Sequence, residues 1–212
     1  MGREFLDVFE KWADSYDDTV HGQGEEYREV FEGYEEILSR VAEKSIGTVV
    51  EFGIGTGNLT KKLLEQGLTV IGIEPSAAMR AIAQKKFADL TIYNGDFLQI
   101  PDAVAKIDTF ASSYAFHHLT DQEKEQAIRL YSETLSSGGK VVFADTVYDS
   151  LEAKAAIIRD AEEKGYENLL KDLQTEYYTT VDVIKNIFLN YSFTVQFTRL
   201  NKYVMLIDAT KK

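Results

Sequence analysis

The chain has 212 residues, of which 44% are hydrophobic and 2 are proline, so it can bury one large core but is short for two independent domains. Because it has no cysteine, disulfides, thiolate metal sites and cysteine nucleophiles are excluded, and a reducing cytoplasm is favoured. The formal net charge of -12 is the wrong sign for binding nucleic-acid phosphates. No apolar run approaches the roughly 18 residues of a spanning helix, and residues 1–15 lack the pattern of a signal peptide. We therefore expect a soluble, cytoplasmic protein without a nucleic-acid or membrane partner.

Two amphipathic helices are predicted before any strand. Apolar side chains recur at spacings of three and four residues over residues 5–17 and again over residues 27–44. Residues 1–44 also hold 13 of the 35 acidic residues but 5 of the 23 basic ones. Most of the net negative charge therefore belongs to these two predicted helices.

From Thr48 onward, short apolar runs alternate with helical stretches. The runs are VVEFG, TVIGIE, LTIYNGD, IDTFASSYAF and KVVFAD. This alternation is typical of βαβ crossovers, and it predicts an α/β fold with a mostly parallel, doubly wound sheet.

The last third of the chain is predicted to be a helical insert followed by a β-hairpin. Residues 150–180 are charged and have a helical pattern, and residues 181–189 form a further predicted helix. The β-rich runs 193–200 and 203–209 are separated by two residues. We expect these runs to pair as an antiparallel hairpin at the far edge of the sheet.

The most informative stretch is the glycine loop VVEFGIGTGNLT, in which a predicted buried strand leads into Gly53, Gly55 and Gly57 and then into a helix. Glycines at this edge of a parallel sheet allow positive φ angles and let a ligand lie against bare backbone. A dinucleotide fingerprint needs its third glycine where Asn58 stands, which weakens the case for a nicotinamide cofactor. A Walker-type phosphate loop is excluded because no Gly-Lys-Ser or Gly-Lys-Thr follows. A tight turn alone does not explain three glycines at alternate positions.

Two carboxylates follow the next two predicted strands. Glu74 ends the second strand, where a carboxylate can accept hydrogen bonds from both hydroxyls of a ribose. Asp96 follows the third strand, where it offers an acceptor for an exocyclic amine beside an apolar wall at Phe97. Each acid alone is as often a solvated charge or a helix cap. Together and in this order, they predict a site for adenosine.

The ordered motifs of the chain resemble a known family. The runs VVEFGIGTGNL, GIEPS, NGDF, DTFASSYAFHHL and SSGGKVVFAD are similar to the motif set of class I S-adenosylmethionine-dependent methyltransferases, and most like their YrrT-like group. The resemblance covers about residues 12–145. It implies a Rossmann-like, seven-stranded sheet whose last strand is antiparallel. It also implies a helical lid over residues 1–44, a cofactor-binding core over 45–145, and a helical insert and hairpin over 146–212.

The resemblance implies a cofactor contact for each motif residue. Gly53, Gly55 and Gly57 would line the methionine and ribose parts of S-adenosylmethionine. Glu74 would bind the ribose hydroxyls, and Asp96 would accept a hydrogen bond from the adenine amine.

Three aromatic residues are also implicated in cofactor binding. The resemblance implies that Phe97 stacks on the adenine or donates its backbone N–H to it. Tyr16 would close over the cofactor, unless it is simply the last core residue of its helix. Both Tyr16 and Tyr114 are candidates for cation–π contact with the sulfonium.

His117 and His118 follow the fourth strand, at the edge where an acceptor would approach. Either imidazole is a candidate general base for an alcohol or amine acceptor, because histidine titrates near neutrality. In the alternative interpretation, one histidine caps the following helix and the other packs. We expect no metal site, because adjacent histidines point in different directions and lack a third nearby ligand. His21 is a further candidate for the same pocket.

Methyl transfer from a sulfonium is an in-line displacement that depends mainly on alignment, so the lack of an obvious nucleophile does not oppose it. The Asn/Asp-Pro-Pro-Tyr/Phe signature of nitrogen methylation is replaced by SSYA at residues 112–115, which together with the acidity favours a small-molecule acceptor. Two alternatives remain open. One is an adenosylmethionine-binding module without turnover. The other is a nicotinamide oxidoreductase, although the chain has no Tyr-x-x-x-Lys pair. The acceptor, the methylated atom and the oligomeric state are not determined by the sequence.

Overall fold

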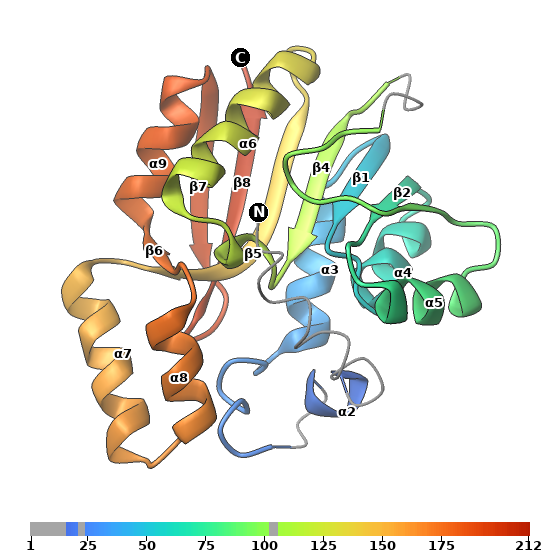
Figure 1. Ribbon diagram of the computed structural model, residues 1–212. Helices are drawn as coiled ribbons and strands as arrows, with labels where there is room; N and C mark the ends of the chain where they lie inside the picture. Colours follow the sequence, from blue (N-terminus) through green and yellow to red (C-terminus); the bar gives the residue numbers. More distant parts are fainter. Residues whose placement is uncertain (1–15, 21–23, 102–105) are drawn as a thin grey trace.

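The computed structural model describes residues 16–20, 24–101 and 106–212, and at its centre is one twisted sheet (Figure 1). The strand order is β3-β2-β1-β4-β5-β8-β7, and the short strand β6 pairs in parallel with the end of β5. β1 to β5 pair in parallel, whereas β8 is antiparallel to both β5 and β7. The strands are β1 (Thr48–Phe52), β2 (Thr69–Ile73), β3 (Thr91–Tyr93), β4 (Thr109–Ser113), β5 (Lys140–Tyr148), β6 (Thr179–Thr180), β7 (Phe193–Arg199) and β8 (Val204–Lys211). The predicted α/β sheet and the C-terminal hairpin are confirmed.

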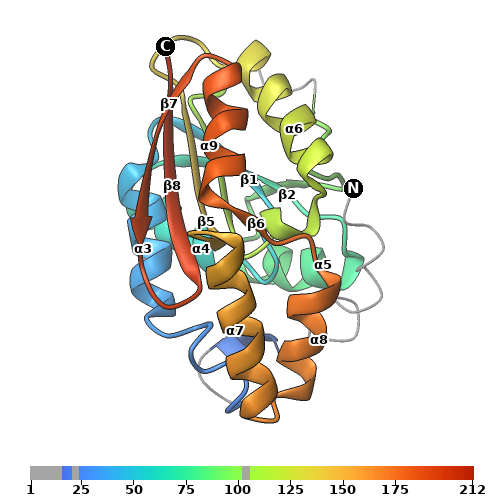
Figure 2. The same cartoon turned by 90° about the vertical axis from the view of Figure 1, so that its left-hand side faces the viewer.

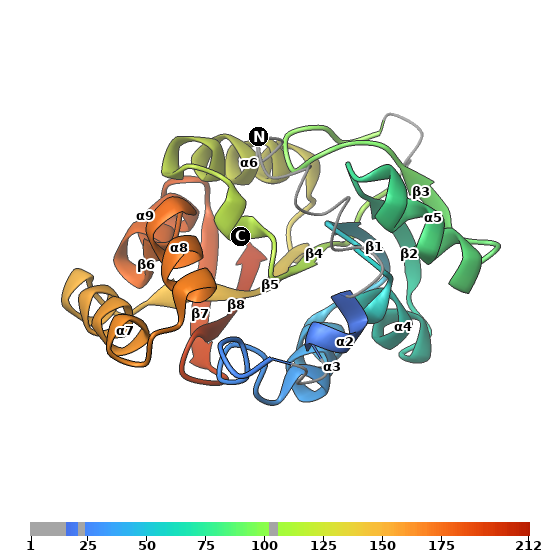
Figure 3. The same cartoon turned by 60° about the horizontal axis from the view of Figure 1, so that its bottom comes forward.

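Helices cover both faces of the sheet (Figure 3). Successive side chains of a strand point to opposite faces, and in β1 Val49 packs in one hydrophobic cluster while Val50 and Phe52 pack in the other. One cluster includes side chains of α6 (Asp121–Thr134) and α9 (Val181–Asn190). The other includes side chains of α3 (Tyr34–Lys44) and α4 (Asn58–Glu65). A strand buried on both faces is apolar at almost every position, as VVEFG is apart from Glu51, and this pattern predicts the strand.

The N-terminal helices differ from the prediction. The first predicted helix lies mostly outside the described residues, and the part that is described belongs to the short helix α2 (Tyr16–Val20). The second was predicted over residues 27–44 but begins at Tyr34, because Gly33 takes a left-handed conformation with φ of +73° and residues 25–33 form turns. Val30 is still buried, so a chain in turns can bury apolar side chains at the same spacing that predicts a helix.

The predicted helical insert is a pair of helices, α7 (Leu151–Glu163) and α8 (Glu167–Thr175), joined at Gly165, whose φ is +69°. Figures 1 and 2 show the pair side by side beyond the carboxyl ends of the parallel strands. The remaining helix, α5 (Ala77–Lys86), follows β2, and its side-chain N-cap is Ser76. No helix within the described ranges is long and apolar enough to cross a membrane.

Candidate functional site

Two cavities lie at the carboxyl edge of the sheet. The smaller, of about 80 Å³, is lined by the loops that follow β1 to β4, and the larger, of about 610 Å³, is lined mainly by the turns before α3 and by α8. Tyr16, Tyr114 and His118 line both cavities. The two cavities therefore adjoin at these three residues.

The glycine loop between β1 and α4 forms part of the wall of the smaller cavity. Gly53 and Gly55 line it, with φ angles of +64° and +55°. A Cβ added at Gly55 would meet no heavy atom within 4 Å, so the backbone there borders open space. Gly57 is placed elsewhere: it is the N-cap of α4, and an added Cβ would lie 2.6 Å from the ring of Phe87. Two of the three predicted glycines thus reach the cavity, and the third supports packing of the helix.

Glu74 and Asp96 line the same cavity, and both are buried. The Glu74 carboxylate accepts hydrogen bonds from the backbone N–H of Gly55 at 3.0 Å and of Ser76 at 2.8 Å. Asp96 accepts one from the N–H of Leu98 at 3.0 Å. The carboxylate of Glu74 therefore ties the glycine loop to the end of β2 at the cavity wall.

Phe97 lines the smaller cavity but belongs mostly to the core. Its ring stacks on Phe52 at a centroid distance of 5.0 Å and contacts Phe116 at 5.4 Å, and the residue is 7% exposed. The ring face toward Phe52 is therefore covered by protein.

Tyr114 takes a conformation that is uncommon for a residue with a side chain. Its φ is +52°, and such backbone conformations cost of the order of 1–3 kcal/mol. The ring packs against Phe31 and Tyr34, at centroid distances of 5.1 Å and 5.6 Å. Burial raises the pKa of Tyr114 well above its ordinary value, and that of Tyr16 to about 12. Both tyrosines are thus neutral phenols at the wall between the cavities.

The two histidines lie in a 3-10 turn, Phe116–His118, after β4. Nδ1 of His117 is 2.6 Å from Oδ1 of Asp145, and the other oxygen of Asp145 accepts backbone N–H groups of residues 115–117. Neither histidine caps α6, because Thr120 does so in a reciprocal capping box with Glu123. The predicted capping role is therefore wrong, and the buried carboxylate of Asp145 orients one of the two rings.

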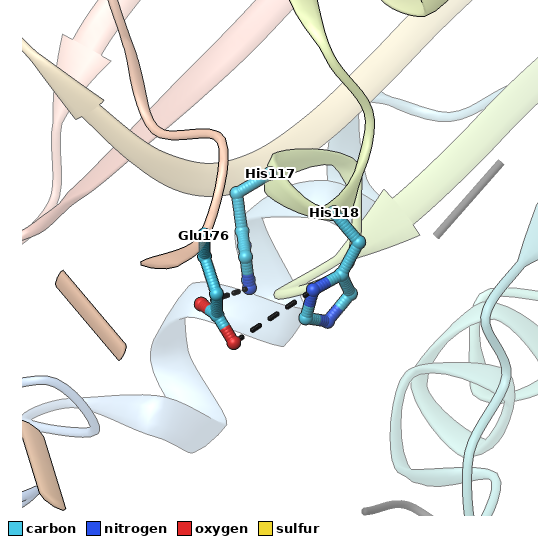
Figure 4. Close-up of side chains that lie close together, drawn as sticks. All are labelled: His117, His118 and Glu176. Atoms are coloured by element: carbon cyan, nitrogen blue, oxygen red, sulfur yellow. Dashed lines mark ion pairs between the residues drawn. The ribbon is translucent and has the colours of Figure 1, made fainter. Parts of the chain in front are cut away.

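Glu176, just after α8, faces both imidazoles (Figure 4). Its carboxylate oxygens lie 3.3 Å from Nε2 of His117 and 3.8 Å from Nδ1 of His118. We expected no third metal-ligating group beside the histidines, and that expectation is wrong: the three donor atoms lie within 4.8 Å of one another. Distant parts of the chain meet here because the α7–α8 pair folds over the carboxyl edge of the sheet.

The charge states of this cluster follow from burial and from its neighbours. Burial opposes the charged form of His117, but the carboxylates of Asp145 and Glu176 outweigh it and raise the pKa of His117. Burial lowers the pKa of His118 well below its ordinary value, and the charge on His117 adds to that effect. Burial also raises the pKa of Glu176. The neighbouring carboxylates therefore favour the charged form of His117, whereas burial favours the neutral form of His118.

Comparisons with known proteins identify the family. The profile of a family described as "Methyltransferase domain" matches residues 49–139. A protein of Anoxybacillus flavithermus named "Uncharacterized methyltransferase" is 56% identical over 212 residues, which are 100% of both chains. The methyltransferase YrrT of Halobacillus halophilus is 50% identical over 211 residues, which cover 100% of this chain and 99% of the other. The chain belongs to this methyltransferase family. The nicotinamide alternative is therefore set aside.

Solved methyltransferase structures share the fold. The crystal structure of magnesium protoporphyrin IX methyltransferase from Synechocystis PCC 6803 with bound SAH superimposes with a TM-score of 0.73 at 16% identity, over 100% of this chain and 99% of the other. At that identity, the likeness shows a common fold. It agrees with the class I sheet expected from the motifs.

Several residues of the histidine cluster and of the larger cavity were not found from the sequence. Asp145 and Glu176 were not singled out, although Asp145 ends the apolar run KVVFAD as Glu74 ends TVIGIE. Tyr27 and Asp172 were also missed; the phenol donates to the carboxylate at 2.5 Å in the larger cavity. His21 lies outside the described residues.

Proposed function

We propose that this methyltransferase holds S-adenosylmethionine in the smaller cavity and transfers its methyl group to a small-molecule acceptor in the larger one. The observation that carries the proposal is the wall of Tyr16, Tyr114 and His118 shared by the two cavities. In the transfer, a bond forms between the acceptor's nucleophile and the methyl carbon while the sulfur–methyl bond breaks. The electron pair returns to sulfur and gives S-adenosylhomocysteine.

The smaller cavity has polar groups suited to the donor. A ligand can lie on the bare backbone of Gly55, its ribose hydroxyls can donate to Glu74, and its adenine amine can donate to Asp96. The volume of about 80 Å³ is below the ~300–1,000 Å³ of typical ligand sites. Binding therefore requires a wall to move, and Tyr16 on the short helix α2 is the wall element that we assign to this movement.

The larger cavity has the size and chemistry of an acceptor site. Its volume of about 610 Å³ lies within the range of small-molecule pockets. Aromatic side chains of Tyr27, Phe31 and Tyr178 line it together with the carboxylates of Asp172 and Glu176. Such a lining disfavours phosphate-rich acceptors and suits a neutral or cationic small molecule.

The histidine pair supplies the polar end of the acceptor cavity. A hydroxyl or protonated amine must lose its proton before or during methyl transfer, and a general base contributes typically ~10²–10⁴-fold to such a step. We assign this role to His118, whose imidazole is kept neutral by burial and lines both cavities.

Isothermal titration calorimetry with S-adenosylmethionine and S-adenosylhomocysteine tests the donor site. We expect one molecule of either to bind per chain. No heat with either ligand, for a protein shown to be folded by circular dichroism, would contradict the proposal.

Mass spectrometry after incubation with a metabolite mixture and S-adenosylmethionine tests turnover. We expect one metabolite to gain a methyl group and S-adenosylhomocysteine to accumulate. Tight cofactor binding with no methyl transfer across a broad panel would instead support a cofactor-binding module without turnover.

A further inference from the structure

Three buried or half-buried side chains converge on one point of the larger cavity. Nε2 of His117 lies 3.3 Å from Glu176, and Nδ1 of His118 lies 3.8 Å from it (Figure 4). Ligands bound at ~2.0–2.2 Å to a tetrahedral metal ion lie about 3.3–3.5 Å from one another. The three donor atoms lie within 4.8 Å of one another, so side-chain rotations that shorten the longer separations would give the spacing of a metal site.

His117 is oriented as metal-ligating histidines commonly are. Its Nδ1 contacts Asp145 at 2.6 Å, which directs Nε2 toward Glu176. Asp145 is fixed in turn by backbone N–H groups of residues 115–117 and of Thr146. A carboxylate that holds the far nitrogen of a ligating histidine sets its tautomer and raises its basicity.

Glu176 also has supporting contacts. The hydroxyl of Tyr178 donates to its Oε2, and the Tyr178 ring stacks on His117 at a centroid distance of 4.8 Å. Lys124 holds the backbone on both sides of the cluster by donating to the carbonyls of Leu119 and Tyr177. The three candidate ligands are thus held by neighbours from β5, α6 and the segment after α8.

The charge of the site favours a cation. The carboxylates of Asp145 and Glu176 flank His117, and Asp172 is a third carboxylate close enough to interact with that ring. The nearby ammonium of Lys124 opposes a cation, but backbone carbonyls bind it.

We propose that His117, His118 and Glu176 bind a divalent transition-metal ion of the Zn²⁺ class, with the open coordination positions facing the larger cavity. Two imidazole nitrogens and one carboxylate favour first-row transition metals over Mg²⁺ or Ca²⁺, which prefer oxygen ligands. The role of the ion rests on the proposed function: with the ion bound, His118 is a ligand and not a general base, and the ion would bind an acceptor oxygen and lower the pKa of that hydroxyl, which releases its proton to water. The existence of the site does not depend on that role.

Metal titration of the full chain, stripped with a chelator, tests the proposal. We expect one Zn²⁺ per chain in calorimetry, and visible d–d absorption when Co²⁺ is added. Glu176→Gln keeps the shape of the side chain but removes its charge, and it should weaken Zn²⁺ binding by at least ~10-fold. The matched control is Glu167→Gln, the same change at an exposed site in the first turn of α8, which should bind Zn²⁺ as the parent chain does.

Two further variants keep the test decisive. His118→Gln should lose the Co²⁺ absorption, and Asp145→Asn should weaken Zn²⁺ binding by about 10–100-fold through His117. The absence of stoichiometric Zn²⁺ and Co²⁺ binding, or equal affinity in Glu176→Gln and Glu167→Gln, would overturn the metal site. Calorimetry with S-adenosylhomocysteine on the same metal-free sample separates the two proposals. If S-adenosylhomocysteine binds and metal does not, the metal site alone fails; if metal binds and S-adenosylhomocysteine does not, the donor site alone fails.

Discussion

Gly55→Ala, compared with Gly67→Ala, tests the placement of the donor. Both glycines have positive φ, +55° and +75°, and at both an added Cβ would meet no heavy atom within 4 Å. The backbone strain of a left-handed alanine is therefore similar at the two positions, about 1–2 kcal/mol. For a domain of this size, each variant should lose roughly 2–8 °C in Tm. The two positions differ in that Gly55 lines the smaller cavity, whereas Gly67 is exposed beyond the end of α4.

The ligand affinity should separate the two variants. A methyl group inserted into a close contact costs about 1–3 kcal/mol, which corresponds to a roughly 5–150-fold rise in the Kd for S-adenosylhomocysteine. Isothermal titration calorimetry at a temperature where both variants are folded measures it. Gly67→Ala should bind as the parent chain does. Equal affinity in the two variants would refute the reasoning that the ligand lies on the backbone of Gly55.

Three further predictions follow from other parts of the molecule. Glu74→Ala should weaken S-adenosylhomocysteine binding by about 1–3 kcal/mol, because charge-assisted hydrogen bonds to the ribose are lost. An unchanged Kd in calorimetry would mean that Glu74 does not bind the ribose and only holds the glycine loop through Gly55. Burial raises the pKa of Glu51 from 4.5 to about 8, so the folded state keeps a proton that the unfolded chain releases. The free energy of unfolding therefore falls by up to about 4–5 kcal/mol as the pH rises from about 4.5 to about 8. Glu51→Gln carries no such proton, so its Tm should rise relative to that of the parent chain between pH 5 and pH 8, and parallel Tm profiles would contradict this. Thr120→Ala removes the N-cap of α6 and should lower the free energy of unfolding in urea by about 0.5–2 kcal/mol; no change would mean that the capping box contributes nothing measurable.

Much of the fold is encoded locally, in stretches that need no knowledge of distant contacts. In the run VVEF, Val49, Val50 and Phe52 are apolar because β1 is covered on both faces, and Glu51 alone interrupts them, so the run indicated a buried strand. Gly55, Glu74 and Asp96 were found for a related reason. Each lies within three residues of the end of a strand, and the carboxyl ends of parallel strands share one edge of the sheet. Their positions in the sequence were therefore enough to place these three residues at the carboxyl edge of the sheet.

Other features depended on contacts between distant segments. Apolar spacing over residues 27–44 fits helix or turns alike, and the left-handed conformation of Gly33 decided where α3 begins. Phe97 lines the smaller cavity, where its contact with the adenine stays a prediction, but the sequence did not show that its ring also stacks on Phe52 in the core.

The histidine pair shows most clearly what the sequence determines and what depends on the tertiary structure. The sequence determined that His117 and His118 follow β4 at the carboxyl edge of the sheet. Only the tertiary structure brought Asp145 from β5 and Glu176 from the end of α8 against them. The physical reason is that the charge state of a buried imidazole depends on burial and on carboxylates a few ångströms away, and separation along the chain carries no information about those distances. The sequence thus set the edge of the sheet where the chemistry lies, and the packing of the α7–α8 pair over that edge decided which groups meet there.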